Sequence, residues 1–331
     1  MKAYSVAVVG ATGMVGRKMA QVLEERNFPV KEISFLASDR SNGKELRFAG
    51  KTHRVQTLTP QSFRGVEIAL FSPGATVSKT MAPHAVAAGT LVIDNSSAFR
   101  MDEEVPLVVP EVNREMIFRH KGIIANPNCS TIQMVVALKP LHDRWRIKRI
   151  VVSTYQAVSG AGNKGSTQLR EEVAGERVKE TKFAHPIAFN VLPHVDVFFD
   201  DGYTREEIKM VKETQKIMGD GGIKVNATCV RVPVYVGHSE SVNVQFAHPF
   251  DLSEIRAALA TAPGVVVEDA PAENRYPLAL HAAERDEVFV GRVRRDDTVP
   301  NGLTMWIVSD NLRKGAATNA VQIAEEWIKG K

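Results

Sequence analysis

The sequence predicts a two-domain α/β protein, in which a parallel sheet covered by helices is followed by an α+β domain with a mixed sheet. Before residue 128, short apolar runs alternate with helical patterns, which favours parallel strands with helices on both faces. Beyond it the apolar runs become longer, β-branched and partly alternating, which is typical of antiparallel or mixed sheets. The 331 residues suffice for two domains of about 150 residues each.

The first domain is expected to open with a strand over Tyr4 to Val9, a glycine turn, and a helix over Arg17 to Arg26. An alanine-rich helix is expected over Lys79 to Ala88. The remaining apolar runs predict further strands of the same sheet, at Ile33 to Ala37, Val66 to Phe71, Leu91 to Ile93, Leu107 to Val109 and Ile123 to Ile124.

In the second domain we expect one helix, Thr204 to Met218, among strands at Lys148 to Val158, Val225 to Val236, Ser241 to Ala247, Val288 to Arg294 and Leu303 to Ser309. The last segment, Gly315 to Lys329, has an apolar helical face and is expected to return to the first domain. The predicted boundaries are therefore residues 1–128 with 313–331, and residues 129–312.

Composition excludes several classes of protein. The 44% hydrophobic and 24% charged residues are ordinary for a globular protein, and no apolar run reaches the roughly 18 residues of a membrane span. Lysine and arginine total 42 against 38 acids, without the concentrated basic stripe that nucleic acid requires. Two cysteines are too few for a disulfide framework, no Cys/His cluster has metal-ligand spacing, and the N-terminus does not resemble a signal peptide. We expect a cytoplasmic protein without a metal.

Cys129 is the strongest candidate for a reactive residue. It follows Asn126-Pro127-Asn128, where an apolar run ends and a helical pattern with Ser130 and Thr131 as candidate caps begins. Unpaired N–H groups and the positive end of the helix dipole favour a thiolate there. Cys229 lies inside an apolar run and is expected to be structural.

Gly10, Gly13 and Gly16 follow the first strand and open the first helix, which is the context of a dinucleotide-binding loop. The spacing G-x-x-G-x-x-G differs from the commoner fingerprint, but the expected contact of pyrophosphate with helix N–H groups is the same. We expect a Rossmann-like domain with Gly10, Ala11, Thr12, Gly13, Met14, Val15 and Gly16 at the cofactor. After the second strand, Ser38, Arg40 and Ser41 favour the 2′-phosphate of NADP, although Asp39 would suit NAD.

Together these motifs resemble the aspartate-β-semialdehyde dehydrogenase family over nearly the whole chain. The motifs that carry the resemblance are Gly10 to Gly16, Asp94 to Arg100, Val108 to Asn113, Asn126 to Thr131, Ser153 to Gly162, Pro186 to Asn190, Arg231 to Val234, His238 to Ser241, Ser309 to Leu312 and Gly315 to Ala317. The resemblance implies reduction of β-aspartyl phosphate to aspartate β-semialdehyde with NADPH and release of phosphate. This step leads to lysine, threonine, methionine and isoleucine.

The resemblance also implies roles for individual residues. Cys129 would form a thioester, His238 would be the general acid/base, and Gln156 would orient the substrate. Arg231 would hold the substrate carboxylate and Glu206 its ammonium group, although the adjacent Glu207 could take that place. Phosphate would be bound by Lys209 and Arg100 with help from Ser97 and Asn128, and cofactor also by Ser159, Gly160, Gly162 and Asn311. A homodimer is implied, with pairing into a homotetramer left open.

Two rival functions follow from the same features. An N-acetyl-γ-glutamyl-phosphate reductase would share the glycine loop, thiol and histidine, but it would not need Glu206 to bind an amine. A non-enzymatic NADP-binding regulator would share the nucleotide fold but would not depend on Cys129.

Overall fold

The computed structural model describes residues 2–330, which form two compact units. Unit 1 comprises Met1–Pro127 with Ala316–Lys331, and unit 2 comprises Asn128–Gly315. Within the described residues, no helix combines the length and apolar character needed to cross a bilayer.

Unit 1 contains a six-stranded parallel sheet in the order β5-β2-β1-β6-β7-β8, which confirms the predicted architecture. Its strands are β1 (Tyr4–Val9), β2 (Val30–Ala37), β5 (Gln56–Thr57), β6 (Ile68–Phe71), β7 (Leu91–Asp94) and β8 (Ile123–Ala125). The prediction of a strand over Leu107 to Val109 was wrong. Only an isolated bridge joins Leu107 to Ala125, because Pro106 and Pro110 flank this run and proline cannot donate to a sheet.

Helices cover both faces of this sheet. Along β1, Val6 and Val8 enter one apolar cluster, whereas Ala7 and Val9 enter another, as alternation in a strand requires. The helical elements of the unit are α1 (Met14–Glu25), η1 (Asp39–Ser41), η2 (Pro60–Phe63), α2 (Ala75–Ala87), α3 (Pro110–Asn113), η3 (Arg114–Arg119) and α9 (Thr318–Lys329). A short hairpin of β3 (Glu45–Phe48) and β4 (Lys51–Arg54) lies outside the parallel sheet.

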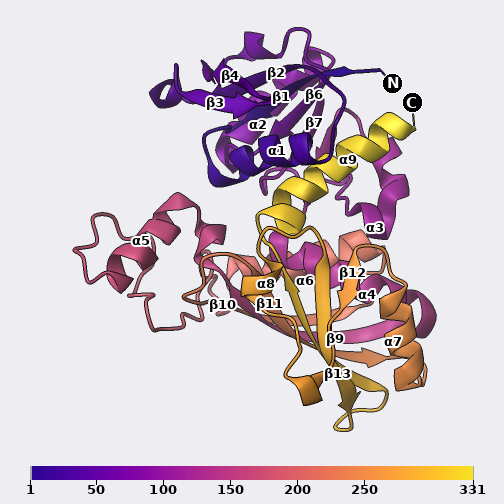
Figure 1. The fold of residues 1–331 in the computed structure, drawn as a ribbon. Coiled ribbons are helices and arrows are strands. Elements are labelled where there is room, and N and C mark those ends of the chain that lie inside the picture. Colours follow the sequence, from indigo (N-terminus) through magenta and orange to yellow (C-terminus); the bar gives the residue numbers. More distant parts are fainter. Residues whose placement is uncertain (1, 331) are drawn as a thin grey trace. The chain divides into compact units, whose positions relative to one another are not determined.

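The C-terminal helix α9 packs among the N-terminal elements, as expected. It contacts α1 and contributes Val321, Ile323 and Trp327 to the apolar cluster that contains Val6 (Figure 1). The Trp327 ring lies 6.2 Å from the Tyr4 ring, centroid to centroid. A π-helical turn, Arg313–Ala317, precedes α9.

Unit 2 contains a mixed sheet in the order β10-β9-β11-β14-β13-β12, as predicted. The β10/β9 and β12/β13 pairs are parallel and the others antiparallel. The strands are β9 (Ile147–Gln156), β10 (Lys224–Arg231), β11 (His238–Phe246), β12 (Val265–Val267), β13 (Val288–Asp296) and β14 (Gly302–Ser309). The expected strand over Val225 to Val236 stops at Arg231, because Pro233 follows.

The expectation of one helix between the strands of unit 2 was wrong. The unit contains α4 (Cys129–Trp145), η4 (Val158–Ala161), α5 (Asn163–Val173), α6 (Arg205–Met218), α7 (Leu252–Ala260), η5 (Pro271–Glu273) and α8 (Ala279–Ala282). In α5 the only fully buried apolar side chain is Leu169, so its periodicity is weak. The capping box of Asp251 and Glu254 could have identified the start of α7 in the sequence.

Strand register brings the candidate site residues of β9, β10 and β11 to one end of the sheet in unit 2. Arg231, the last residue of β10, pairs with Gln156, the last residue of β9. One row deeper, Thr154 of β9 pairs with both Cys229 of β10 and Glu240 of β11. His238 begins β11 two residues before Glu240 and therefore lies on the same face.

Candidate active site

Cys129 is the first residue of α4, and Asn128 is the N-cap. The Asn128 Oδ1 atom accepts hydrogen bonds from the backbone N of Ser130 (3.0 Å) and of Thr131 (3.2 Å). The expectation that Ser130 and Thr131 cap this helix was therefore wrong: the short asparagine side chain supplies the acceptor. Gly315 lies against the thiol-bearing residue, since a Cβ atom on Gly315 would be 2.9 Å from the Cys129 Cβ.

Two glutamates of α6 bind Asn128. Its backbone N donates to Glu213 Oε2 (2.6 Å), and its side-chain Nδ2 donates to Glu206 Oε1 (2.7 Å). Glu213 was not among the predicted site residues. Its position seven residues after Glu206, two helical turns on the same face, was the signal that could have identified it. The residue before Cys129 is therefore held at its backbone and at both ends of its side chain.

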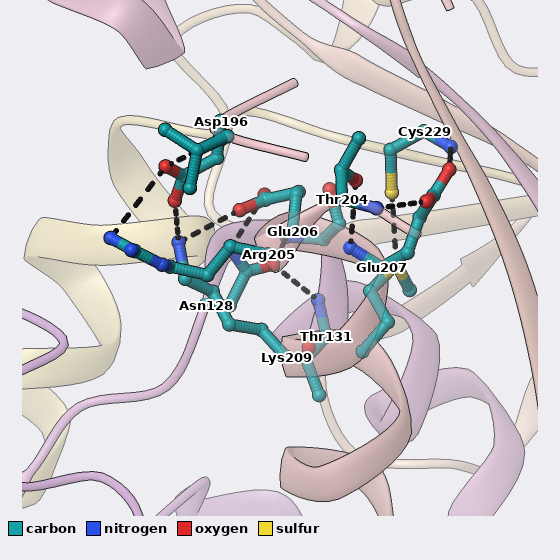
Figure 2. Close-up of polar contacts among 12 residues, drawn as sticks. Asn128, Thr131, Asp196, Thr204, Arg205, Glu206, Glu207, Lys209 and Cys229 are labelled. Atoms are coloured by element: carbon teal, nitrogen blue, oxygen red, sulfur yellow. Dashed lines mark hydrogen bonds and ion pairs between the residues drawn. The ribbon is translucent and has the colours of Figure 1, made fainter. Parts of the chain in front are cut away.

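Glu206 is buried at the centre of a polar cluster (Figure 2). It accepts from Asn128 and from Gln156 Nε2 (3.0 Å), and its Oε2 lies 3.1 Å from Lys209 Nζ. Burial alone would raise its pKa, but the Lys209 charge and these hydrogen bonds outweigh burial and lower the pKa to about 2. Glu206 is therefore an ionised, buried carboxylate and not half of a surface ion pair. Lys209 also contacts Asp196 Oδ2 (2.8 Å).

The adjacent Glu207 has a different environment. It forms a capping box with Thr204 at the start of α6, and its Oε1 accepts from the backbone N of Cys229 (3.0 Å) (Figure 2). Both Glu207 oxygens thus accept from backbone N–H groups, one at the start of α6 and one on β10. Glu206, and not Glu207, faces Asn128 and Gln156.

Gln156 links the end of β9 to both helices. Its Nε2 donates to Ser130 Oγ (2.6 Å) and to Glu206 Oε1, so both amide hydrogens are used. Its Oε1 is buried and has no hydrogen-bond partner among residues 2–330. The free group that Gln156 offers is therefore an acceptor.

His238 is fully buried, and a hydrogen bond from a backbone N–H to its ring defines the tautomer. The backbone N of Ala157 donates to His238 Nδ1 (3.0 Å), so the ring proton lies on Nε2. That Nε2 has no partner within the described part of the chain. Burial, followed by the Arg231 charge, lowers the His238 pKa to about 3. The group is a neutral imidazole that presents one N–H donor.

Arg231 is buried beside these groups. Its Nη1 donates to the Ala157 carbonyl (2.7 Å), and its buried Nε finds no acceptor among the described residues. Burial lowers the pKa of Arg231, and the charges of Glu206 and Cys129 oppose that shift. A guanidinium remains charged in such a site and needs an anion.

Four predicted cofactor residues lie in unit 2. Ser159 and Asn311 hydrogen-bond to each other through Asn311 Nδ2 and Ser159 Oγ (2.9 Å), and Asn311 Oδ1 also accepts from Gly237 N (2.9 Å). A Cβ atom on Gly160 would lie 3.0 Å from Arg231 Nη1 and 3.3 Å from His238 Nε2. Gly160 thus leaves room beside the imidazole and the guanidinium, whereas Gly162 adopts φ +78° in open space.

In unit 1 the glycine loop is closely packed. A Cβ atom on Gly10, which has φ +80°, would lie 2.6 Å from Ser72 O, and one on Gly16 would lie 2.3 Å from Gly10 O. Gly13 is the N-cap of α1 and supplies no side-chain acceptor. The first N–H groups of α1 are therefore available to an anion, as a bound pyrophosphate requires.

A pocket of about 550 Å³ opens beside this loop. Gly10, Thr12, Gly13 and Ser38 line it, and so does Asp39. Ala11 is buried, and Met14, Val15 and Gly16 form the start of α1. Ser41 is buried and contacts Thr12 Oγ1 through its hydroxyl (3.2 Å), and Arg40 is exposed on η1.

Ser97 and Arg100 also belong to unit 1. Ser97 is exposed after β7, whereas Arg100 is buried and donates from Nη2 to the Asn95 carbonyl (2.9 Å). Among residues 2–330 no group of three His, Cys, Asp or Glu side chains could hold a metal ion. Neither cysteine forms a disulfide within the described residues, and burial raises the pKa of Cys229 strongly.

Comparison with known proteins agrees with this geometry. Residues 5–120 match the family model "Semialdehyde dehydrogenase, NAD binding domain", and residues 138–314 match "Semialdehyde dehydrogenase, dimerisation domain". Aspartate-semialdehyde dehydrogenase of Aquifex aeolicus is 59% identical over 98% of each chain.

Two solved structures are similar over almost their full length. Aspartate semialdehyde dehydrogenase II of Vibrio cholerae, complexed with ASA, has a TM-score of 0.96, 50% identity and 99% coverage of both chains. The Candida albicans enzyme with NADP has a TM-score of 0.77, 25% identity and 98% coverage of both chains. The chain therefore belongs to the aspartate-semialdehyde dehydrogenase family.

Proposed function

We propose that this protein reduces β-aspartyl phosphate to aspartate β-semialdehyde and phosphate through a thioester on Cys129. The observation that carries the proposal is a thiol at the first position of α4, next to a charged Arg231 and a cluster built around ionised Glu206. The thiolate attacks the acyl carbon, the C–O bond to phosphate breaks, and phosphate leaves with the electron pair. NADPH, when bound, supplies the hydride that reduces the thioester carbonyl. The C–S bond then breaks, and the aldehyde and the thiolate are released.

Substrate selectivity follows from the charges in unit 2. Arg231, with a buried Nε that lacks an acceptor, would bind the substrate carboxylate. Glu206 is ionised and buried, so it would bind the substrate ammonium group. Lys209 would bind phosphate, a role that the resemblance also gives to Arg100 and Ser97. Asn128 has its polar atoms committed to the protein, which supports a role in positioning Cys129.

The imidazole of His238 would act at the substrate oxygen. Its Nε2–H is a preorganised donor that would stabilise the oxyanion of the tetrahedral species. To accept the thiol proton, the ring would need its proton moved to Nδ1, which breaks the bond from Ala157 N. Gln156, through its unpartnered Oε1, would accept a hydrogen bond from the substrate ammonium group.

NADP is the proposed cofactor. The glycine loop and pocket of unit 1 fit a dinucleotide, and Ser38 at the pocket wall suits a 2′-phosphate with Arg40 and Ser41 nearby in sequence. Asp39 also lines the pocket, so the ratio of kcat/KM for NADP to that for NAD is the measurement that tests this choice.

We further propose a homodimer formed through unit 2. Several aromatic side chains between α5 and α6 are exposed, among them Phe189, which is 90% exposed, and Phe198 and Phe199. Large exposed apolar groups mark contact surfaces. The cytoplasm is the proposed location, because two cysteines in the thiol form suit a reducing compartment.

The test is turnover in the oxidative direction with aspartate semialdehyde, phosphate and NADP. Cys129→Ala should lower kcat by about 10⁴-fold or more, since the nucleophile is removed, and should leave NADP affinity within about twofold. Mass spectrometry of quenched parent enzyme should find an aspartyl adduct on Cys129. Normal turnover by the variant would exclude the covalent route. Preference for the N-acetylated glutamate semialdehyde would favour the rival reductase.

A further inference from the structure

Glu240 is a further buried glutamate near His238, and none of the roles described above involves it. Glu240 is on β11, two residues after His238 and on the same face of the sheet, in register with Thr154 of β9. It is fully buried. Neither carboxyl oxygen makes a hydrogen bond of normal geometry within residues 2–330, although the Gln133 side chain lies close to it. Such a group requires an explanation, because buried polar atoms are almost always satisfied.

Gln133 connects this carboxyl to both reactive residues. It is one helical turn after Cys129 on α4, so the two side chains lie on the same face of the helix. Its Nε2 donates to the backbone carbonyl of His238 (3.3 Å). Its Oε1 is buried and, like the Glu240 oxygens, has no partner in the described chain.

The charges around Glu240 determine its protonation state. Burial raises the Glu240 pKa well above its ordinary value, and the contact with the Gln133 amide only partly opposes this. Glu206, Glu207 and Glu240 all act on the Cys229 thiol, and the nearest cation on this face is Arg231, at the end of β10. Among the described residues no cation, Arg231 included, contributes to the pKa shift of Glu240. A buried carboxylate without a cation is very costly, so the neutral acid is expected. A neutral acid has one O–H to donate, and the Gln133 side chain, which lies close to the carboxyl, has an unused acceptor in Oε1.

We propose that Glu240 is a positioning residue that, through Gln133, fixes the backbone of His238 relative to the helix that begins at Cys129. The acid O–H donates to Gln133 Oε1, which orients the amide so that its Nε2 donates to the His238 carbonyl. This inference rests on the proposed function, in which the Cys129 thiol and the His238 N–H act on one substrate carbon and its oxygen. Displacements of about 1 Å in such a geometry cost up to about 10²-fold in rate.

The test compares two replacements of equal size. Glu240→Gln keeps a donor that can reach Gln133 Oε1 and should retain kcat within about twofold. Glu240→Met fills the same space without a donor and should lower kcat about tenfold or more, with KM within about twofold, because it changes alignment and not substrate binding. Gln133→Leu should resemble Glu240→Met, and the double variant should be no worse than either. Thr214→Val, which removes another buried unpartnered hydroxyl of unit 2 from α6, is the matched control and should leave kcat unchanged.

Two results would overturn the inference: parental kcat in Glu240→Met, or an equal loss in Glu240→Gln and Glu240→Met. Infrared spectroscopy of the parent provides a test that does not depend on whether Glu240→Met folds. At pH 8 the carbonyl stretch of a protonated carboxylic acid should be present and should disappear in Glu240→Gln; its absence from the parent would also overturn the inference. If the Glu240 tests fail but Cys129→Ala is inactive, the proposed function still holds and only the role of Glu240 is refuted. If Cys129→Ala is active, the proposed function itself is refuted.

Discussion

The glycine loop of unit 1 and the polar cluster of unit 2 are built by different means. The loop is one contiguous segment, and its shape depends on missing Cβ atoms at Gly10 and Gly16 and on backbone N–H groups. The cluster draws side chains from α4, α6, β9, β10 and β11, and strand register and hydrogen bonds hold it together. A loop of this kind can be recognised in the sequence, whereas the cluster exists only after the sheet and helices have assembled.

The largest expected effect comes from adding a Cβ atom to a closely packed glycine of the loop. Gly16→Ala would place a Cβ atom 2.3 Å from Gly10 O and 2.8 Å from the Ala11 Cα, both backbone atoms that cannot turn aside. We expect a loss of about 3 kcal/mol of stability together with loss of NADP binding. Thermal unfolding and cofactor titration measure the two effects. Gly221→Ala, at a position with open space around it, is the control and should change stability by less than about 0.5 kcal/mol. A parental melting temperature for Gly16→Ala would contradict this account of the loop.

The cluster should be sensitive to charge rather than to space. Glu206→Gln would remove the carboxylate between Asn128, Gln156 and Lys209. We expect kcat/KM to fall about 10²-fold, or about 2.7 kcal/mol of transition-state stabilisation, because the proposed ammonium partner is lost. The adjacent Glu207→Gln is the matched control. It should cost about 1 kcal/mol of stability, because an amide N–H would replace one of the two oxygens that accept from the backbone N of Thr204 and of Cys229, and it should leave kcat/KM nearly unchanged. Equal losses of kcat/KM in the two variants would refute the separation of their roles.

This difference also explains which parts of the molecule the sequence predicted. Tyr4–Val9 with its glycine turn, and the apolar face of α9, carry local patterns, and both elements formed as expected. The sequence could not decide between Glu206 and Glu207, since both occur in the first turn of α6. The direction of each side chain depends on where Asn128 and Cys229 lie in the assembled unit.

The residues that sequence reasoning missed are those whose role depends on tertiary register. Glu213 acts on the backbone of Asn128, and Gln133 acts on the backbone of His238. Neither residue type suggests such a role. Glu240 stood within the His238 to Ser241 motif, but only burial and strand pairing show that its carboxyl lacks a partner.

The neutral state of His238 predicts a pH dependence of stability. Its pKa is lowered from the ordinary histidine value of 6.5 to about 3 in the folded protein, so below pH 6.5 the unfolded chain binds a proton that the folded protein does not. The contribution of neutral His238 to the free energy of unfolding is therefore complete above pH 6.5. Below pH 6.5 the free energy of unfolding decreases by about 1.4 kcal/mol for each pH unit. His238→Gln should remove this slope. Denaturant unfolding of both proteins between pH 5 and 8 avoids the range in which Glu206 titrates. A difference in stability that stays constant over this range would show that His238 can be protonated in the folded state.

The smallest expected effect concerns Cys229, which we expect to be a structural residue of the cluster, in contrast to the reactive Cys129. Cys229 is buried in β10, its Sγ lies 4.0 Å from Met210 Sδ, and burial raises its pKa, so it should remain a thiol at neutral pH. Iodoacetamide at pH 8 should therefore alkylate Cys129 in the native protein and leave Cys229 unmodified, as peptide mass spectrometry can determine. Cys229→Ala should keep kcat/KM within about twofold and cost about 1 kcal/mol of stability, because it leaves a small cavity. A large loss of activity in this variant, without a matching loss of stability, would mean that Cys229, which lies next to Arg231 along β10, takes part in the chemistry.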